Sequence, residues 1–252
     1  MNSPAQTSFE SNHNKHLDAA IKPASIWKRT YNTLLDAAPH KVSVKLALSR
    51  PDGACSHYAI ELLPDEPEHH ELNLRYLERT LKFLLWQRGG SRVDISGCDS
   101  LTEKLSRIYS SQGERAFDAK FFGDNLYETP LEIMPCAEEN LPEPRENPLA
   151  LGGHLDGCRI GFDLGGSDRK CAAVIDGDVV FSKEIRWDPY FEKDPQYHIK
   201  GIRDSLRRAA EHLPRVDAIG GSAAGVYVNN RVRVASLFRG VSETDFDTHV
   251  RD

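Results

Sequence analysis

The stretch Cys158-Arg-Ile-Gly-Phe-Asp-Leu-Gly-Gly-Ser-Asp-Arg-Lys-Cys-Ala-Ala-Val-Ile175 decides the expected fold. Apolar residues on both sides of Gly165-Gly166-Ser167 predict two antiparallel strands joined by a short turn. Asp176-Gly177-Asp178 is a tight hairpin signal, so we expect a third strand over residues 179–185. Glycines let backbone N–H groups converge on an anion, and Asp163, at a strand end, can face a phosphate-bound Mg²⁺ through water. A plain β-hairpin turn is the alternative interpretation of the same glycines.

The residues that follow predict a helix and then a further strand. Asp194-Pro195 is an N-cap followed by a first-turn proline, and an apolar stripe over residues 199–213 predicts the helix itself. Residues 217–225 indicate a buried strand that runs into a loop of small residues. A strand over 231–237 and a helix over 243–250 come next. The order β-β-β-α-β is that of the N-terminal lobe of an actin-like, ribonuclease-H-type ATPase fold.

Three motifs in residues 158–252 resemble the ROK family of bacterial sugar kinases and sugar-responsive regulators. Gly161-Phe-Asp-Leu-Gly-Gly-Ser167 resembles the first phosphate motif of that family. Ile219-Gly-Gly-Ser-Ala-Ala-Gly-Val226 is similar to its small-residue loop near the sugar, with Ala224-Gly225 in place of the usual Pro-Gly. Asn230-Arg-Val-Arg-Val-Ala-Ser-Leu237 resembles the next strand and loop. The resemblance implies an α/β kinase lobe, incomplete within this chain.

The same resemblance implies ATP and Mg²⁺ as cofactors and a hexose-type sugar as the substrate or effector. Carried over by position, Asp163 would help to hold the metal. The nucleotide phosphates would contact Gly165, Gly166 and Ser167, and the sugar would lie near Ser222 and Gly225. The implied reaction transfers the γ-phosphoryl group of ATP to a sugar hydroxyl, which depends on positioning and charge stabilisation.

The carboxylate that would accept the sugar's proton is not identified in this chain. In the family it lies in an Asn-Asp motif, and no Asn-Asp dipeptide follows Leu237. We therefore predict no catalytic residue within the chain, expect the base beyond Asp252, and expect the chain alone to be inactive. Two alternatives remain open. One is a non-catalytic regulator or pseudokinase that senses a sugar or nucleotide, and the other is an interaction protein in which Gly165-Gly166 is only a turn.

The first 157 residues show no motif that demands chemistry. Residues 1–24 are polar and predict a disordered N-terminal tail. Residues 25–130 predict a small α+β domain of unknown role, with a helix, a hairpin, the helix 71–87, the strand 92–96 and a last helix. A capping-box signature, Ser100 with Glu103, predicts the start of that last helix. Residues 131–157 are rich in Pro and Glu and predict an inter-domain linker.

Composition limits the compartment and the partners. The formal charge is −6, which argues against a nucleic-acid partner. Five widely spaced cysteines without a Cys-x-x-Cys pair predict reduced thiols in the cytoplasm, without a disulfide framework or zinc site. No apolar run reaches roughly eighteen residues, so we expect no membrane partner. An interrupted lobe would expose apolar surface, so homo-oligomerisation is left open.

Overall fold

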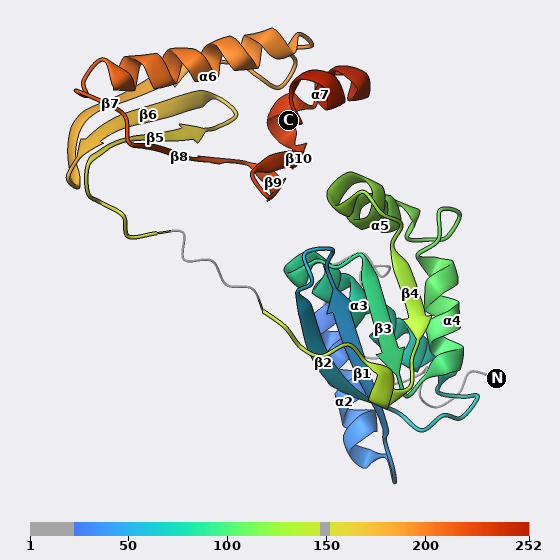
Figure 1. Cartoon of the computed structure of the whole chain (residues 1–252). Coiled ribbons are helices and arrows are strands. Elements are labelled where there is room, and N and C mark those ends of the chain that lie inside the picture. Colours follow the sequence, from blue (N-terminus) through green and yellow to red (C-terminus); the bar gives the residue numbers. More distant parts are fainter. Residues whose placement is uncertain (1–22, 147–151, 252) are drawn as a thin grey trace, which may run out of the picture. The chain divides into compact units, whose positions relative to one another are not determined.

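The computed structural model describes residues 23–146 and 152–251. The chain divides into two units, Met1–Pro148 and Leu149–Asp252, and each is described by itself. It is an α/β protein with two mixed four-stranded sheets (Figure 1). The predicted disordered tail lies outside the described residues up to residue 22. In the part of the chain that is described, no helix is long and apolar enough to cross a membrane.

The N-terminal unit combines one sheet with helices, as the pattern of residues 25–130 predicts. The sheet order is β2-β1-β3-β4, and β1 pairs antiparallel with both β2 and β3. Its elements are α2 (Ala24–Ala37), β1 (Val42–Ser49), β2 (Cys55–Leu62), α3 (His70–Arg88), β3 (Arg92–Ser96), α4 (Asp99–Ile108), α5 (Ala116–Lys120), the π-helix η1 (Phe121–Tyr127), β4 (Glu132–Pro135) and the 3₁₀-helix η2 (Glu138–Asn140).

A buried tyrosine links the helices of this unit to its sheet. The Tyr31 hydroxyl donates to Asn73 Oδ1 at 2.7 Å and accepts from the Leu63 amide at 3.2 Å. Asn73 Nδ2 in turn donates to the Leu63 carbonyl at 3.0 Å. Burial raises the pKa of the Tyr31 hydroxyl well above its ordinary value. Every polar group of this cluster is thereby paired, which is what allows it to be buried beside Trp27 and Leu35.

The expected linker over 131–157 begins instead with a strand. Residues Glu132–Pro135 form β4, which pairs in parallel with β3. Further along, Arg145 exchanges two backbone hydrogen bonds with Cys55 at the end of the sheet. The prolines and glutamates that suggested a linker are compatible with β4 because it is a short edge strand in which Ile133 is buried. The predicted capping box was also wrong, because the helix begins at Asp99 after Cys98.

The C-terminal unit has the predicted order of three strands, a helix and a strand. Its main sheet has the order β7-β6-β5-β8, with β5 to β7 antiparallel and β8 parallel to β5. Its elements are β5 (Cys158–Leu164), β6 (Asp168–Ile175), β7 (Asp178–Arg186), α6 (Pro195–Ala210), β8 (Ala218–Ala223), β9 (Gly225–Val228), β10 (Arg231–Ala235), the 3₁₀-helix η3 (Ser236–Phe238) and α7 (Glu243–His249).

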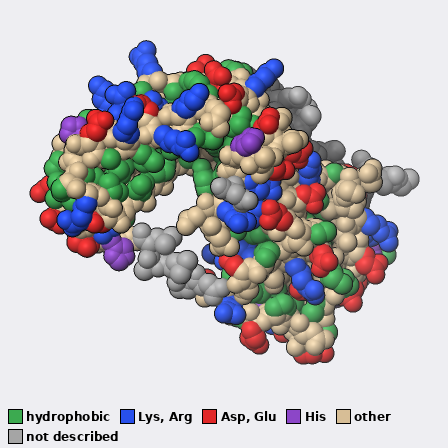
Figure 2. All heavy atoms as spheres, turned by 45° about the horizontal axis from the view of Figure 1, so that its top comes forward, with side chains coloured by type: hydrophobic (Ala, Val, Ile, Leu, Met, Phe, Trp, Pro, Cys, Tyr) green, Lys and Arg blue, Asp and Glu red, His purple; other side chains and the backbone are tan. Residues whose placement is uncertain are grey.

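Helix α6 covers one face of this sheet (Figure 1). The helix begins as predicted, with Asp194 Oδ1 accepting from the Gln196 amide at 2.9 Å and Pro195 in the first turn. Its Ala209 is buried against Ile160 and Ala173 of the sheet. The opposite, polar surface of α6 carries Lys and Arg residues, and Figure 2 shows blue side chains gathered on this unit around the helix.

The other face of the sheet is not covered by α6 and carries polar and small residues. Cross-strand partners share a face of a sheet. The register pairs Asp163 with Lys170 on β6 and with Ser222 on β8, and Lys170 with Glu184 on β7. These four residues therefore form a polar row across all four strands. We call this side the open face.

Candidate functional site

Asp163 and Ser222 meet at the centre of the polar row. They come from the neighbouring parallel strands β5 and β8 and are in register. Ser222 Oγ donates a hydrogen bond to Asp163 Oδ1 at 2.5 Å. Asp163 is half-buried, and Leu164, the last residue of β5, separates it from the glycine turn. The predicted metal residue and one predicted sugar residue are thus brought together by the sheet, 59 positions apart in the chain.

The Gly165-Gly166-Ser167 turn is closed by backbone and side-chain hydrogen bonds. The Gly165 amide donates to the Asp168 carbonyl at 2.9 Å, so this amide is used within the turn. Trp187 fixes the turn from outside, because its Nε1 donates to the Gly165 carbonyl at 2.8 Å and its amide donates to the Ser167 carbonyl at 3.1 Å. Ser167 Oγ donates to Asp168 Oδ2 at 3.0 Å. The amides of Gly166 and Ser167 take no part in the backbone bonds that close this turn within the described chain.

Gly166 has a packing requirement of its own. A Cβ atom at this position would collide with the ring of Tyr190. The guanidinium carbon of Arg239 lies over the same ring, 3.9 Å from its centroid. The absence of a side chain at Gly166 therefore leaves room for the Tyr190 ring. That ring in turn contacts the Arg239 guanidinium, which brings a positive charge near the turn. Both the plain-turn interpretation and the anion-site interpretation of Gly166 are compatible with this contact.

A cavity of about 400 Å³ lies on the open face beside Asp163. Its lining includes Asp163, Lys170 and Glu184 from the polar row. A hydrogen bond from Lys170 to Asp168, followed by the charges of Asp168, Glu184 and Asp163, raises the pKa of the Lys170 ammonium. The cavity thus has a carboxylate and a permanent cation on adjacent strands, which suits a ligand that carries both a metal and anionic oxygens.

A second cavity, of about 560 Å³, lies between α6, the end of β8 and the β9–β10 ribbon. Ser222 lines this cavity, together with Leu164, Tyr227 and the buried His198. His198 Nε2 is shared between the carbonyls of Pro189 at 3.1 Å and Leu237 at 2.9 Å. This imidazole therefore holds the loops around the cavity together. Ser222 lines the second cavity and is hydrogen-bonded to Asp163, which lines the first.

Gly225, the other predicted sugar residue, lies at the start of β9. A Cβ atom there would lie 2.5 Å from the Val234 carbonyl oxygen and 2.9 Å from Ala235 Cβ. The close pairing of β9 with β10 thus requires a glycine at this position whether or not a ligand binds. Among the described residues, neither cavity is lined by Gly225 or by residues 165–167.

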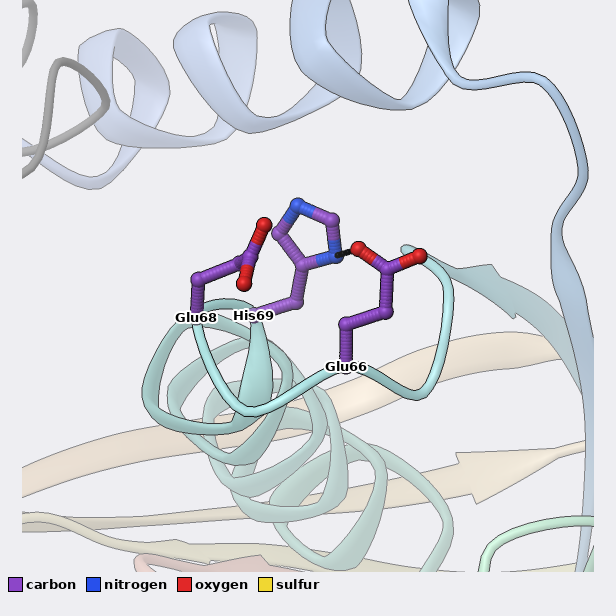
Figure 3. Close-up of side chains that lie close together, drawn as sticks. All are labelled: Glu66, Glu68 and His69. Carbon is purple, nitrogen blue, oxygen red and sulfur yellow. Dashed lines mark ion pairs between the residues drawn. The ribbon is translucent and has the colours of Figure 1, made fainter.

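A separate group of potential metal ligands lies in the N-terminal unit (Figure 3). One ligand atom from each of Glu66, Glu68 and His69 lies within 4.8 Å of the others. His69 Nδ1 lies 4.0 Å from Glu66 Oε2 and is also 3.1 Å from the Pro64 carbonyl, so the nitrogen on the side of Glu66 already has a backbone partner. One imidazole and two carboxylates suit Zn²⁺ or Mn²⁺. Both glutamates are exposed, however, and exposed carboxylates commonly gather without an ion, so we assign none.

Sequence reasoning missed three residues around the turn. Tyr190 and Arg239 lie outside the three quoted motifs, and their contact depends on a loop that no local pattern predicts. Lys170 was placed on a strand without a role, although strict alternation with Cys171 could have assigned it to the face of Asp163.

Comparison with known proteins gives only distant likenesses. No protein-family profile matches the chain, and no curated protein matches it. Among solved structures, a Ppx/GppA family member from Aquifex aeolicus is 14% identical over 71% of this chain and 62% of its own, with a TM-score of 0.19. An exopolyphosphatase from Cytophaga hutchinsonii is 10% identical over 72% of this chain and 64% of its own, with a TM-score of 0.21.

These likenesses are too weak to carry an argument. The chain spans less than two thirds of the length of either solved structure. Membership of the ROK family is not supported by any match and stays a prediction from the sequence motifs.

Proposed function

We propose that the C-terminal unit binds a Mg²⁺–nucleotide at the end of β5 and acts in phosphoryl transfer to a sugar hydroxyl. The observation that carries the proposal is the placement of Asp163, a half-buried carboxylate held by Ser222 and separated from the glycine turn by Leu164 alone. The sugar as acceptor rests on the sequence motifs alone.

The residues present suit magnesium. Mg²⁺ keeps several waters and is usually bound by one or two carboxylates together with substrate phosphates, without a complete protein cage. Asp163 Oδ1 accepts the bond from Ser222, and no hydrogen bond to Oδ2 is found among the described residues. Asp163 lines the 400 Å³ cavity. Bound there, the ion would neutralise charge on the transferred phosphoryl group.

The turn supplies donors for phosphate oxygens. Because the Gly165 amide is already bonded to Asp168, its contribution is the shape of the turn. The amides of Gly166 and Ser167 are the donors left for an anion, because the Ser167 hydroxyl already donates to Asp168 Oδ2. Arg239, held over Tyr190, adds positive charge next to the turn. Lys170 adds a second cation on the adjacent strand.

A second candidate function, sensing without catalysis, is favoured by the last described helix. Its two aspartates are already engaged, which argues against either as a proton acceptor. Asp245 Oδ2 accepts from the N-cap Ser242 Oγ at 2.7 Å. Asp247 Oδ1 forms an ion pair of 2.9 Å with Arg251. A chain that binds nucleotide but contributes no base would act as a regulator or pseudokinase.

Isothermal titration calorimetry with Mg²⁺–ATP tests the proposal. The wild-type chain should bind, and Asp163→Asn, which keeps the shape and removes the charge, should lower the affinity at least about tenfold, or 1.4 kcal/mol. Asp178→Asn, at an exposed turn on the far end of β7, is the matched control and should bind as the wild type does. Equal affinity of the wild type and Asp163→Asn would remove Asp163 from the site. Transfer of phosphate from ATP to a panel of hexoses then separates a kinase from a sensor.

A further inference from the structure

Helices α3 and α5 expose large aromatic side chains in the N-terminal unit. Phe83 is 61% exposed, Trp86 48% and Phe117 70%. Single exposed apolar residues are ordinary, but contiguous patches mark interaction sites. The question is therefore whether these rings form one surface.

The rings are joined through Phe121, the first residue of the π-helix η1. The Trp86 ring is stacked on Phe121 with 4.7 Å between centroids, and Phe117 is stacked on Phe121 at 6.1 Å. Trp86 also meets Phe122 edge-on at 5.2 Å. Trp86, Phe121 and Phe117 thus form a continuous aromatic ridge from α3 to α5, and Phe83 extends it along α3.

The ridge is held rigid from below. Asp118 is 3% exposed, and its Oδ1 accepts a hydrogen bond of 2.8 Å from Trp86 Nε1. Its Oδ2 pairs with Lys82 Nζ at 3.4 Å. A side chain that is already ordered loses little entropy on binding, and Trp is enriched among the residues that dominate interface energies. The irregular η1 beside the ridge is also of a kind found frequently at functional sites.

The charge along α3 next to the ridge is positive. Arg79, Lys82, Phe83 and Trp86 follow the spacing i, i+3, i+4, i+7 and therefore share one face of the helix. The acidic residue nearest in sequence, Glu78, is buried and bonded to Arg115 at 2.6 Å. On the α5 side the charge is mixed, with Lys120 near Glu114 and Asp124.

We propose that the aromatic ridge docks an acidic amphipathic helix of another protein. A helical stripe at this spacing packs against the stripe of a second helix, and acidic residues beside its apolar face would meet Arg79, which is exposed, since Lys82 already pairs with Asp118. A second copy of this chain would place the same basic residues of α3 on both sides of the interface, where like charges repel.

Fluorescence anisotropy with a designed peptide tests this docking surface. The probe is a labelled four-turn helix with Leu and Phe on one face and Glu on the other, and its control carries Gln for each Glu. The full chain should bind the Glu peptide more tightly than the Gln peptide, and added salt should reduce that difference. Phe83→Ser and Phe117→Ser should each weaken binding at least about tenfold, and Arg79→Glu should weaken the Glu peptide only.

The control variant is Tyr58→Ser, which removes an exposed aromatic ring from β2, outside the ridge, and should leave binding unchanged. Circular dichroism checks that the variants fold. We expect them to fold because Phe83 and Phe117 are exposed. The proposal is overturned if the Glu peptide does not bind, if the Gln peptide binds equally well, or if the phenylalanine variants bind as the wild type does. Self-association abolished by Phe117→Ser would overturn it in favour of a second copy. Oligouridylate binding abolished by Phe117→Ser would do so in favour of nucleic acid.

Discussion

Ser222 Oγ donates a hydrogen bond of 2.5 Å to Asp163 Oδ1 across the parallel pair β5–β8. The bond fixes one oxygen of the carboxylate, and Asp163 lines the 400 Å³ cavity on the open face. Position and orientation of the proposed metal residue therefore depend on sheet register, which in turn depends on the connection through α6.

Replacing Ser222 with Ala should weaken Mg²⁺–ATP binding without unfolding the chain. The exposed hydroxyl contributes one hydrogen bond to a carboxylate, and such bonds are worth about 1.5 to 3 kcal/mol. Calorimetry should show an affinity lowered roughly tenfold, where 1.4 kcal/mol is one decade. Ser182→Ala is the control, since Ser182 lies on the same open face, opposite Ala172, and makes no bond to Asp163. A larger loss in Ser182→Ala than in Ser222→Ala would contradict the orienting role.

Replacing Gly166 with Ala should destabilise the C-terminal unit. The added Cβ collides with the Tyr190 ring, and overpacking of this kind costs about 1 to 3 kcal/mol. Urea denaturation should show the loss, and Gly166→Ala should cost little stability when it is introduced into the Tyr190→Ala variant, where the ring is absent. Nucleotide affinity measured on the double variant then reports whether Gly166 also contacts the ligand. A stable Gly166→Ala single variant would show that the collision is relieved at no cost.

Asp204 should make the stability of the C-terminal unit depend on pH. Hydrogen bonds from Arg208, Arg169 and Arg207 hold the pKa of this carboxyl well below its ordinary value of 3.8. Because the folded pKa is depressed, the stabilisation is present above pH 3.8 and is lost as the pH falls below that value.

Urea midpoints of the wild type and Asp204→Asn across this range check the prediction. Near neutral pH the variant should be less stable by about 1.5 to 3 kcal/mol, because Arg169 is left nearly buried with its main partner uncharged. The difference should shrink toward the acid end. A difference that stays constant with pH would exclude titration of Asp204 as its cause, and Asp178→Asn serves as the exposed control.

Tyr31→Phe should destabilise the N-terminal unit by about 1 to 3 kcal/mol. The substitution leaves buried Asn73 Oδ1 without its 2.7 Å donor, although the Leu63 amide still reaches that oxygen at 3.2 Å. Thermal unfolding monitored by circular dichroism measures the change. Tyr58→Phe, at an exposed position on β2, should have little effect. Equal melting temperatures for the two variants would show that the buried hydroxyl adds no stability.

The sequence predicted those parts of the fold in which local patterns and tertiary contacts agree. Alternating apolar residues placed β1 and β3, and Asp194-Pro195 placed the start of α6. The edge strand β4 escaped prediction because its four residues contain a proline and only one buried side chain, Ile133. Its pairing with β3 is a tertiary contact, and the Pro/Glu-rich composition around it favoured a linker.

The site was predictable in its residues and not in its arrangement. The motif predicted Asp163 and the turn, but the bond from Ser222 depends on the register of β8. The hydrogen bond from the Gly165 amide to the Asp168 carbonyl depends on the geometry of the turn. The packing of Tyr190 on Gly166 depends on a loop that no local sequence pattern predicts. The aromatic ridge was missed for a related reason, since Phe117 and Trp86 lie on different helices and only the fold brings them together.

Paramagnetic broadening by Mn²⁺–ATP is the most direct test of whether the nucleotide binds at the end of β5. In the ¹H–¹⁵N spectrum of the chain, we expect Mn²⁺–ATP to broaden the amides of residues 163–167 first. We expect Asp163→Asn to abolish this broadening. Broadening centred on Glu66, Glu68 and His69, with residues 163–167 unaffected, would place the metal at the exposed cluster of the N-terminal unit. That result would contradict the assignment of the nucleotide site to the end of β5.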